Sequence, residues 1–330
     1  MKRYLAALAA IALAGSLPAG AVEVTVSAAP ITRFKEAGLD EPVDKLIFRG
    51  GVALVAQDDT FGGLSGITST NRDGQVAFVT DRGNWITGQL AYDDANRLFG
   101  FIGVNIEPMQ NSKGAPLPRQ YAKDAESVDT VYRDGAAVAA RVAFENLTRV
   151  ADFDLVNGIP SGPAREVQIP QWLSDTRSNE ALESLCIAPP TSPIAGSTLL
   201  LTEDVRDERG DHRGWLLGQN DKGPISLSDT PVVNPTDCAF LPNGDLLVLE
   251  RGVSMLSFVM HLRRIPAAEV RPGALMTGEL LLSATGGSID NMESLMVHTA
   301  PNGEQRILIG SDNNFTDWQR SLLLEFALPE

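Results

Sequence analysis

The chain has 330 residues, of which 43% are apolar and 21% are charged, which is ordinary for a globular protein with a sizeable core. Its formal net charge of −15 argues against nucleic acid and anionic membranes as partners, because both repel an acidic surface. The same charge suits a protein that meets cations, and a surface kept acidic for solubility explains it equally well.

The chain begins with the three parts of a secretory signal peptide. Lys2 and Arg3 precede an apolar run over residues 4–17, and small residues follow at 19–21. That run is too short to cross a bilayer, and no later stretch approaches ~20 apolar residues. We therefore predict a signal peptide over residues 1–21 and a periplasmic or secreted protein with no membrane insertion. No low-complexity linker divides residues 22–330, which we expect to form a single domain and a monomer.

The mature chain then reads as short strands joined by tight turns. Two strand-like runs, at residues 24–28 and 45–56, precede a hairpin pattern: an apolar strand, a turn, and a second strand that ends on an acidic residue. The clearest turn is Asn243-Gly244, which predicts a two-residue primed turn with positive φ at both positions. The hairpin recurs five times, at residues 62–81, 123–145, 179–203, 234–251 and 291–312.

Repeats about 54 to 62 residues apart, each built from several short strands, are typical of a β-propeller. A third strand follows each hairpin and a fourth follows most of them, so we predict an all-β propeller of four-stranded blades. We count five blades and leave open a sixth, irregular one in the first section. The last repeat has only three strands, so an N-terminal strand should complete it and close the ring.

Acidic residues recur at both ends of the hairpin pattern. In a propeller the innermost strand begins, and the second strand ends, on one face, so these side chains should converge at one mouth of the central channel. With 42 acidic residues in 330, chance predicts about one acid in eight positions, yet nine of these ten are acidic. The opening positions are Leu64, Glu126, Glu183, Asp237 and Glu293, and the closing positions are Asp81, Glu145, Glu203, Glu250 and Asp312.

So many carboxylates in one place need a counter-charge, and two sources fit. One is a hard cation, Ca²⁺ or alternatively Mg²⁺, because the pattern offers oxygen ligands and no nearby His or Cys. The other is local pairing with arginines, since Arg82, Arg149, Arg206 and Arg251 each closely follow a closing acid. The predicted metal ligands are Glu126, Glu183, Glu203, Asp237, Glu293 and Asp312, with added carbonyl oxygens from Asn179, Asn234, Asn291, Asn313 and Asn314.

Arginines beside a metal would also cradle an anion, because the guanidinium fork matches phosphate and carboxylate. We therefore predict a small anionic or ester substrate at the mouth. The candidate catalytic residues are Glu183, Glu250, Arg82, Arg206 and Arg251.

The only two cysteines, Cys186 and Cys238, fall in the first strands of neighbouring blades. In an exported protein they could form a disulfide bond, or they could pack as two buried thiols. The sequence does not give the Cα separation that decides between the two.

A series of short motifs resembles the phytase-like family, described by "esterase-like activity of phytase", of exported bacterial propeller proteins. The motifs are G-G-L-S-G-I at 62–67, T-D-R-G at 80–83, D-A-E-S at 124–127, E-A-L-E-S-L at 180–185, L-T-E-D at 201–204 and P-N-G-D-L-L-V-L-E-R-G at 242–252. The resemblance covers nearly the whole mature chain. It implies a propeller fold, hydrolysis of a phosphoester or ester, and calcium in an acidic mouth that binds phosphate. Two alternatives stay open: a non-catalytic propeller that binds a ligand or protein, and a lactonase-type propeller with one central metal.

Overall fold

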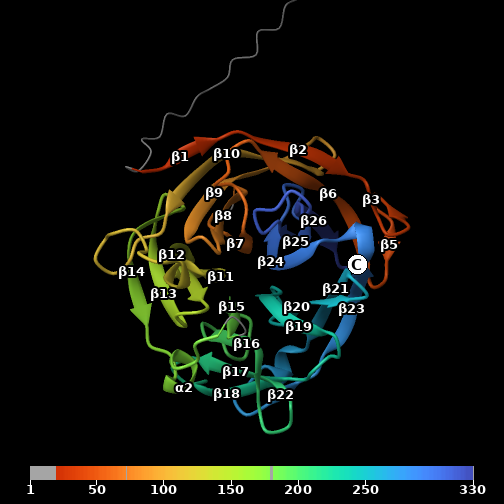
Figure 1. Cartoon of the computed structure of the whole chain (residues 1–330). Coiled ribbons are helices and arrows are strands. Elements are labelled where there is room, and N and C mark those ends of the chain that lie inside the picture. Colours follow the sequence, from red (N-terminus) through yellow and green to blue (C-terminus); the bar gives the residue numbers. More distant parts are fainter. Residues whose placement is uncertain (1–19, 72, 179–180, 330) are drawn as a thin grey trace, which may run out of the picture.

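The computed structural model describes residues 20–71, 73–178 and 181–329, so most of the predicted signal peptide lies outside the described residues. Its strands form five sheets set around a common centre, and the innermost strand of each sheet faces that centre (Figure 1). The predicted all-β propeller is confirmed, with five blades and not six. None of the helices in the described part of the chain is long and apolar enough to cross a membrane.

Each blade is an antiparallel sheet of four successive strands, numbered from the centre outward. Blade 1 has β7 (Leu64–Ser69), β8 (Gln75–Thr80), β9 (Asn84–Tyr92) and β10 (Leu98–Pro108); blade 2 has β11 (Ala125–Arg133), β12 (Ala136–Phe144), β13 (Arg149–Val156) and β14 (Ile159–Val167). Blade 3 has β15 (Leu182–Ile187), β16 (Thr198–Arg206), β17 (His212–Leu217) and β18 (Gly223–Leu227); blade 4 has β19 (Val233–Phe240), β20 (Leu246–Ser254), β21 (Ser257–Ile265) and β23 (Glu279–Thr285). Blade 5 has β24 (Asn291–Thr299), β25 (Gln305–Asp312), β26 (Ser321–Ala327) and β6 (Leu46–Ala56).

The short elements lie at the edges and links of the blades. They are β3 (Arg33–Phe34), β4 (Ala37–Gly38), β5 (Pro42–Val43), β22 (Leu275–Met276), α1 (Gln120–Lys123), α2 (Gln171–Ser174) and two 3₁₀ turns at Ala267–Glu269 and Gly286–Ser288. Strand β22 adds to the edge of blade 3 by pairing with β18.

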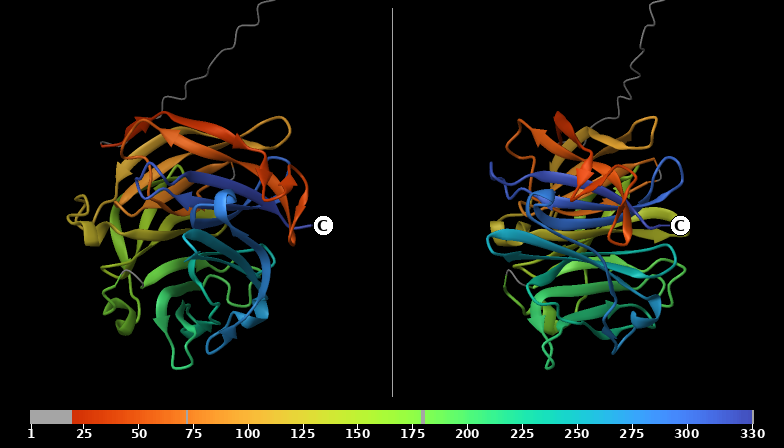
Figure 2. Two further views of the ribbon diagram at one scale, coloured as in Figure 1. Left: turned by 45° about the vertical axis from the view of Figure 1, so that its right-hand side comes forward. Right: turned by 90° about the vertical axis from the view of Figure 1, so that its right-hand side faces the viewer.

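The N-terminal segment closes the ring, as predicted. Strand β6 pairs with β26 and so supplies the fourth strand of blade 5, and β2 (Val26–Ile31) adds a fifth. Strand β1 (Val22–Val24) instead pairs with β10 of blade 1. Figure 2 shows the first strands, in red and orange, beside the last ones, in dark blue. One segment thus joins the first blade to the last, so the ring has no free junction.

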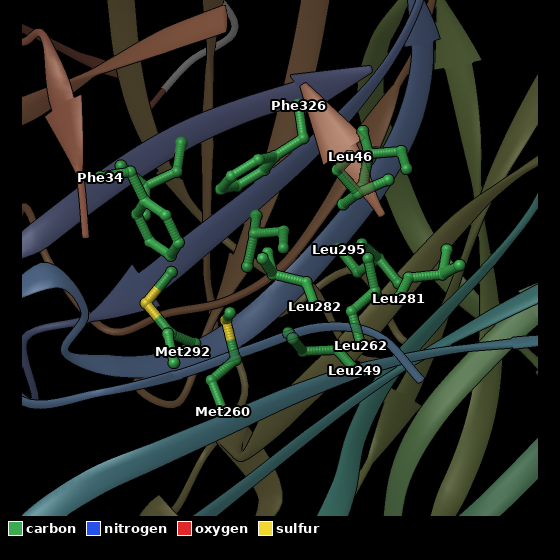
Figure 3. Close-up of a cluster of buried hydrophobic side chains, with 14 of the residues drawn as sticks. Phe34, Leu46, Leu249, Met260, Leu262, Leu281, Leu282, Met292, Leu295 and Phe326 are labelled. Atoms are coloured by element: carbon green, nitrogen blue, oxygen red, sulfur yellow. The ribbon is translucent and has the colours of Figure 1, made fainter. Parts of the chain in front are cut away.

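Apolar clusters fill the spaces between the blades. Five clusters of buried side chains occur in the described residues, one at each junction of neighbouring blades. The largest lies between blades 4 and 5, where Phe34, Phe48 and Phe326 pack with ring centroids 5.0–5.7 Å apart (Figure 3). Alternation along each strand explains the arrangement, because successive side chains face opposite neighbouring blades.

Two local expectations are decided by the structure. Cys186 and Cys238 form a disulfide between β15 and β19, with Cα atoms 5.7 Å apart, so the thiol alternative is wrong. The primed turn at Asn243-Gly244 is also wrong. Gly244 has φ of +93°, but Asn243 does not have positive φ, and Leu241 N–H donates to the Asp245 carbonyl across a longer connection.

Candidate functional site

A β-bulge interrupts the innermost strand of every blade at the same level. In each of these strands the pairing with the second strand skips one residue, and the skipped residues are Ser65, Glu126, Glu183, Thr236 and Glu293. A bulge bends the strand and re-aims the side chain of the extra residue, often next to a functional site. Three of the five re-aimed side chains are glutamates.

The bulges correct the predicted alignment of the opening positions. The structural equivalents of Glu126, Glu183 and Glu293 are Ser65 and Thr236, not Leu64 and Asp237. Asp237 lies one residue further along and is 1% exposed. It accepts hydrogen bonds from the Ser127 hydroxyl at 2.7 Å and from the Leu295 backbone N–H at 2.8 Å, so it ties the inner strands of blades 2, 4 and 5 together beneath the mouth.

The register corrects the closing position in blade 4 in the same way. Pro235 pairs with Glu250 where Leu182 pairs with Thr202, so Arg251, and not Glu250, is equivalent to Glu203. Glu250 is fully buried and accepts a hydrogen bond from Arg263 at 2.7 Å. The structure therefore places Asp237 and Glu250 away from the other predicted site residues.

The remaining predicted acids meet at one end of the ring. They form what we call the mouth cluster: Asp81, Asp124, Glu126, Glu145, Glu183, Glu203, Glu293 and Asp312. Two groups of three, Asp124 with Glu126 and Glu145, and Glu145 with Glu183 and Glu203, each hold carboxylate oxygens within 4.8 Å of one another. Because Glu145 belongs to both groups, they form one continuous arc across blades 2 and 3.

One arginine stands among these carboxylates. The Nη2 atom of Arg251 lies 3.5 Å from Glu293 and 3.8 Å from Glu203. Its Nε–H is buried and has no hydrogen-bond partner among the described residues. One guanidinium is too little positive charge for eight carboxyl groups, so the mouth cluster is strongly undercompensated.

The electrostatic consequence is a set of raised pKa values in the metal-free protein. Burial, and then the charge of Glu126, raises the pKa of Glu145 to about 9. Burial and neighbouring carboxylates also raise the pKa values of Glu126 and Glu183 well above the usual range. Asp81 and Asp312 each have a pKa of about 7, because burial and then a nearby carboxylate disfavour the ionised form. A cation bound here would remove the same penalty.

The donor set fits a hard divalent cation. Every member of the mouth cluster is an oxygen donor, which is the chemistry of Ca²⁺ and Mg²⁺ sites. Two buried oxygen atoms also lack a hydrogen-bond partner among the described residues: Asp81 Oδ1 and Asn291 Oδ1. Asn291 is 3% exposed, and its Nδ2 donates to Glu293 at 2.7 Å, so its amide lies directly beside the mouth cluster. Buried oxygens without donors are what an absent cation would leave behind.

The predicted arginine partners are arranged differently from the expectation of local pairing. Arg82 stacks on Phe315, with its Cζ 3.3 Å from the ring centroid, while Arg149 stacks on Phe144 at 3.7 Å. Arg206 forms ion pairs with Asp204 and Asp229 and donates to Asn234 at 2.9 Å. Of the three predicted anion-binding arginines, Arg251 contacts the mouth cluster and Arg82 borders it through Asp81, whereas Arg206 is already paired elsewhere.

The loop between β25 and β26 covers the mouth beside blade 1. Asn314 and Phe315 both have positive φ, 47° and 51°, a conformation that costs non-glycine residues energy. Gly63 lets the loop approach, because a Cβ there would lie 2.5 Å from the Phe315 ring and 2.4 Å from Asp81 Oδ1. The loop thus fixes Phe315 under Arg82 at the edge of the mouth cluster.

Comparison with known proteins identifies the family. The model of the phytase-like family, described as "Esterase-like activity of phytase", matches residues 59–315, most of the chain. The chain belongs to this family. The match spans all five bulges and the whole mouth cluster. No curated protein matches the sequence.

Solved structures with a similar chain path are distant. The PQQ-bound aldose sugar dehydrogenase from Streptomyces coelicolor is 11% identical, with a TM-score of 0.42 and coverage of 94% of this chain and 99% of that one. A chain of the outer coat vertex of COPII on membranes is also 11% identical, with a TM-score of 0.40 and coverage of 88% and 73%. We draw no functional argument from these likenesses.

Sequence reasoning missed two residues of the site. Asp124 precedes the bulge acid Glu126 inside the D-A-E-S motif, and this position was open to inspection. The role of Arg251 as the only arginine at a closing position depends on the register of β19 and β20, which no sequence pattern reveals. Asn179 and Glu180, which the repeat and the family motif include, lie outside the described residues.

Proposed function

We propose that this protein is an exported, calcium-dependent hydrolase of a phosphoester or ester, with its active site at the mouth cluster. The observation that carries the proposal is the charge imbalance of this site, in which eight converging carboxyl groups face one arginine. Two buried oxygens without donors, Asp81 Oδ1 and Asn291 Oδ1, support a cation as the missing partner. Membership of the phytase-like family supports the hydrolytic part.

The residues divide into two sets by their chemistry. The arc of Glu126, Glu145, Glu183 and Glu203 would hold the cation through carboxylate oxygens, with Mg²⁺ as the alternative metal. A bound divalent cation would polarise the ester oxygen and lower the pKa of a coordinated water. The protein's own role is to keep these oxygens converging by means of the bulges, so that little rearrangement accompanies binding.

The arginines give the site a preference for anionic substrates. Arg251 offers a buried Nε–H without a partner, and Arg82 presents a guanidinium whose one face is covered by Phe315. Guanidinium groups bind phosphate and carboxylate through paired N–H donors. We therefore expect a phosphoester to be preferred over an uncharged ester, and hydrolysis to add water across the P–O or C–O bond to give an acid and an alcohol.

Export is part of the proposal. The disulfide between Cys186 and Cys238 suits an oxidising compartment, and it agrees with the leader predicted from the sequence. The protein that is purified for any assay should therefore begin near residue 22 and be prepared without reductant.

The test is an activity screen with controlled metal. The mature protein is stripped with a chelator, restored with calcium or magnesium, and assayed on a nitrophenyl phosphate, a nitrophenyl acetate and an aldonolactone. The account predicts phosphoester turnover that requires the added metal and is lost in Glu183→Gln but kept in Glu36→Gln, an exposed acid far from the mouth. Binding of calcium without turnover of any substrate would contradict the hydrolase while leaving the cation site intact.

A further inference from the structure

A second cavity, separate from the mouth cluster, lies on the outer half of blade 3. It has a volume of about 220 Å³ and opens between α2 and strands β17 and β18. Its walls carry two tryptophans, Trp172 and Trp215, two arginines, Arg209 and Arg213, and the small residues Gly214, Gly273 and Ala274. Pockets for drug-sized ligands begin at ~300 Å³, so this one fits a ligand of about one ring.

The charge of this cavity is opposite to that of the protein. Asp207 and Arg209 neutralise each other through contacts of 3.0 Å, and Arg209 also approaches Asp211 at 3.6 Å. Arg213 has no carboxylate within ion-pairing distance among the described residues. Its guanidinium instead stacks on Trp172, with Cζ 3.8 Å from the ring centroid. In a protein with a formal charge of −15, an uncompensated guanidinium in a cavity is a site for an anion.

The rest of the cavity demands more from a ligand than negative charge. The Ser226 hydroxyl donates to Asp207 Oδ2 at 2.8 Å, so its oxygen is oriented toward the cavity wall as an acceptor for a ligand hydroxyl. The indole Nε1 atoms of Trp172 and Trp215 are buried without partners among the described residues, so the rings contribute apolar surface to the lining. A ligand that satisfies this lining has an anionic group, hydroxyl groups and an apolar ring face.

We propose that this cavity binds a single sugar unit that carries a negatively charged group, either a carboxylate or a phosphate. The anionic group meets Arg213, a ring hydroxyl donates to Ser226, and the C–H face of the sugar lies against a tryptophan. Gly273 and Ala274 keep the opposite wall low, and a Cβ placed at Gly273 would meet no atom within 4 Å. This inference does not depend on the proposed hydrolase, because no member of the mouth cluster lines the cavity.

Binding is measured by calorimetry and by tryptophan fluorescence in the mature protein, with chelator present so that no metal at the mouth takes part. The probes are glucuronate, glucose 6-phosphate, glucose and inorganic phosphate. We expect saturable binding of glucuronate, glucose 6-phosphate or both, at least about 10-fold tighter than binding of glucose and of inorganic phosphate. Whichever charged sugar binds more tightly identifies the anionic group.

Variants assign the binding to the cavity. Arg213→Gln should weaken it about 10-fold or more, while Arg213→Lys, which keeps the charge, should retain most of it. Arg33→Gln removes an exposed arginine elsewhere, and Glu183→Gln alters the mouth, so both should bind as the wild type does. No saturable binding of either charged sugar, equal binding of inorganic phosphate, or unchanged binding by a folded Arg213→Gln would each overturn the proposal.

Discussion

The two ends of blade 5 solve the same electrostatic problem in opposite ways. At the end away from the mouth, Glu325 is fully buried and meets three donors: the Tyr92 hydroxyl, His298 Nε2 at 3.0 Å and Arg306 Nη1 at 2.8 Å. At the mouth end of the same blade, Glu293 and Asp312 are hydrogen-bonded to each other, and the nearest cation is Arg251, 3.5 Å from Glu293.

The difference separates structural acids from acids that await a ligand. A buried carboxylate contributes to the fold when donors and a counter-charge satisfy it, as they do for Glu325 and for Asp237. The mouth cluster lacks such partners, and its carboxyl groups have raised pKa values as a result. Acids that destabilise the metal-free fold are expected where a cation binds.

The largest expected effect comes from breaking the satisfied end. Glu325→Gln keeps the volume but leaves Arg306 without its buried counter-charge, so the free energy of unfolding should fall by about 3–5 kcal/mol. Denaturant titration measures it. Calcium affinity should not change, and Glu279→Gln, in an exposed pair with Lys45, should cost less than about 1 kcal/mol.

The matched change at the mouth should have the opposite sign on stability. Glu183→Gln removes one of the crowded carboxylates, so the chelated protein should melt at the same temperature as the wild type or higher. Calcium affinity and turnover should fall about 100-fold, equivalent to about 3 kcal/mol. If this variant instead destabilised the chelated protein as strongly as Glu325→Gln does, the distinction between the two clusters would be lost.

The pH dependence of the chelated protein sharpens the same contrast. Groups whose folded pKa is raised above the unfolded value stabilise the fold at low pH and lose that contribution as pH rises through the folded pKa. With pKa values of about 7 for Asp81 and Asp312 and about 9 for Glu145, chelated protein should lose about 2 kcal/mol between pH 6 and pH 9. Urea titrations at the two pH values test this, and added calcium should reduce the loss.

The smallest effect concerns a hairpin that has no part in either cluster. Met255 and Leu256 form the turn between β20 and β21 with φ of 49° and 65°, and both are fully exposed. Asn-Gly is preferred in such a turn, so replacing both residues should add about 1 kcal/mol of stability. Calcium affinity should stay at the wild-type value, and a loss would show that the hairpin supports the mouth.

The sequence was sufficient for the architecture because the hairpin repeat, its turns and its spacing all point to one fold. The three-strand final repeat even predicts the closing role of β6. The site was only partly predictable. Glu126, Glu183 and Glu293 are correctly placed because bulges occur where the acids stand, but in blade 4 the neighbouring residues Thr236 and Asp237, and Glu250 and Arg251, exchange roles. A one-residue shift in register turns every side chain to the other face, and nothing in N-P-T-D-C-A-F marks where the bulge falls.

The central claim is that the mouth cluster is a cation site, and calorimetric titration of calcium into the chelated mature protein tests it most directly. The account predicts saturable binding, a higher melting temperature with calcium, and loss of both in Glu183→Gln but not in Glu325→Gln. No heat of binding and no change in melting temperature with calcium or magnesium would contradict it, and the acids of the mouth would then be held by shared protons and Arg251 alone.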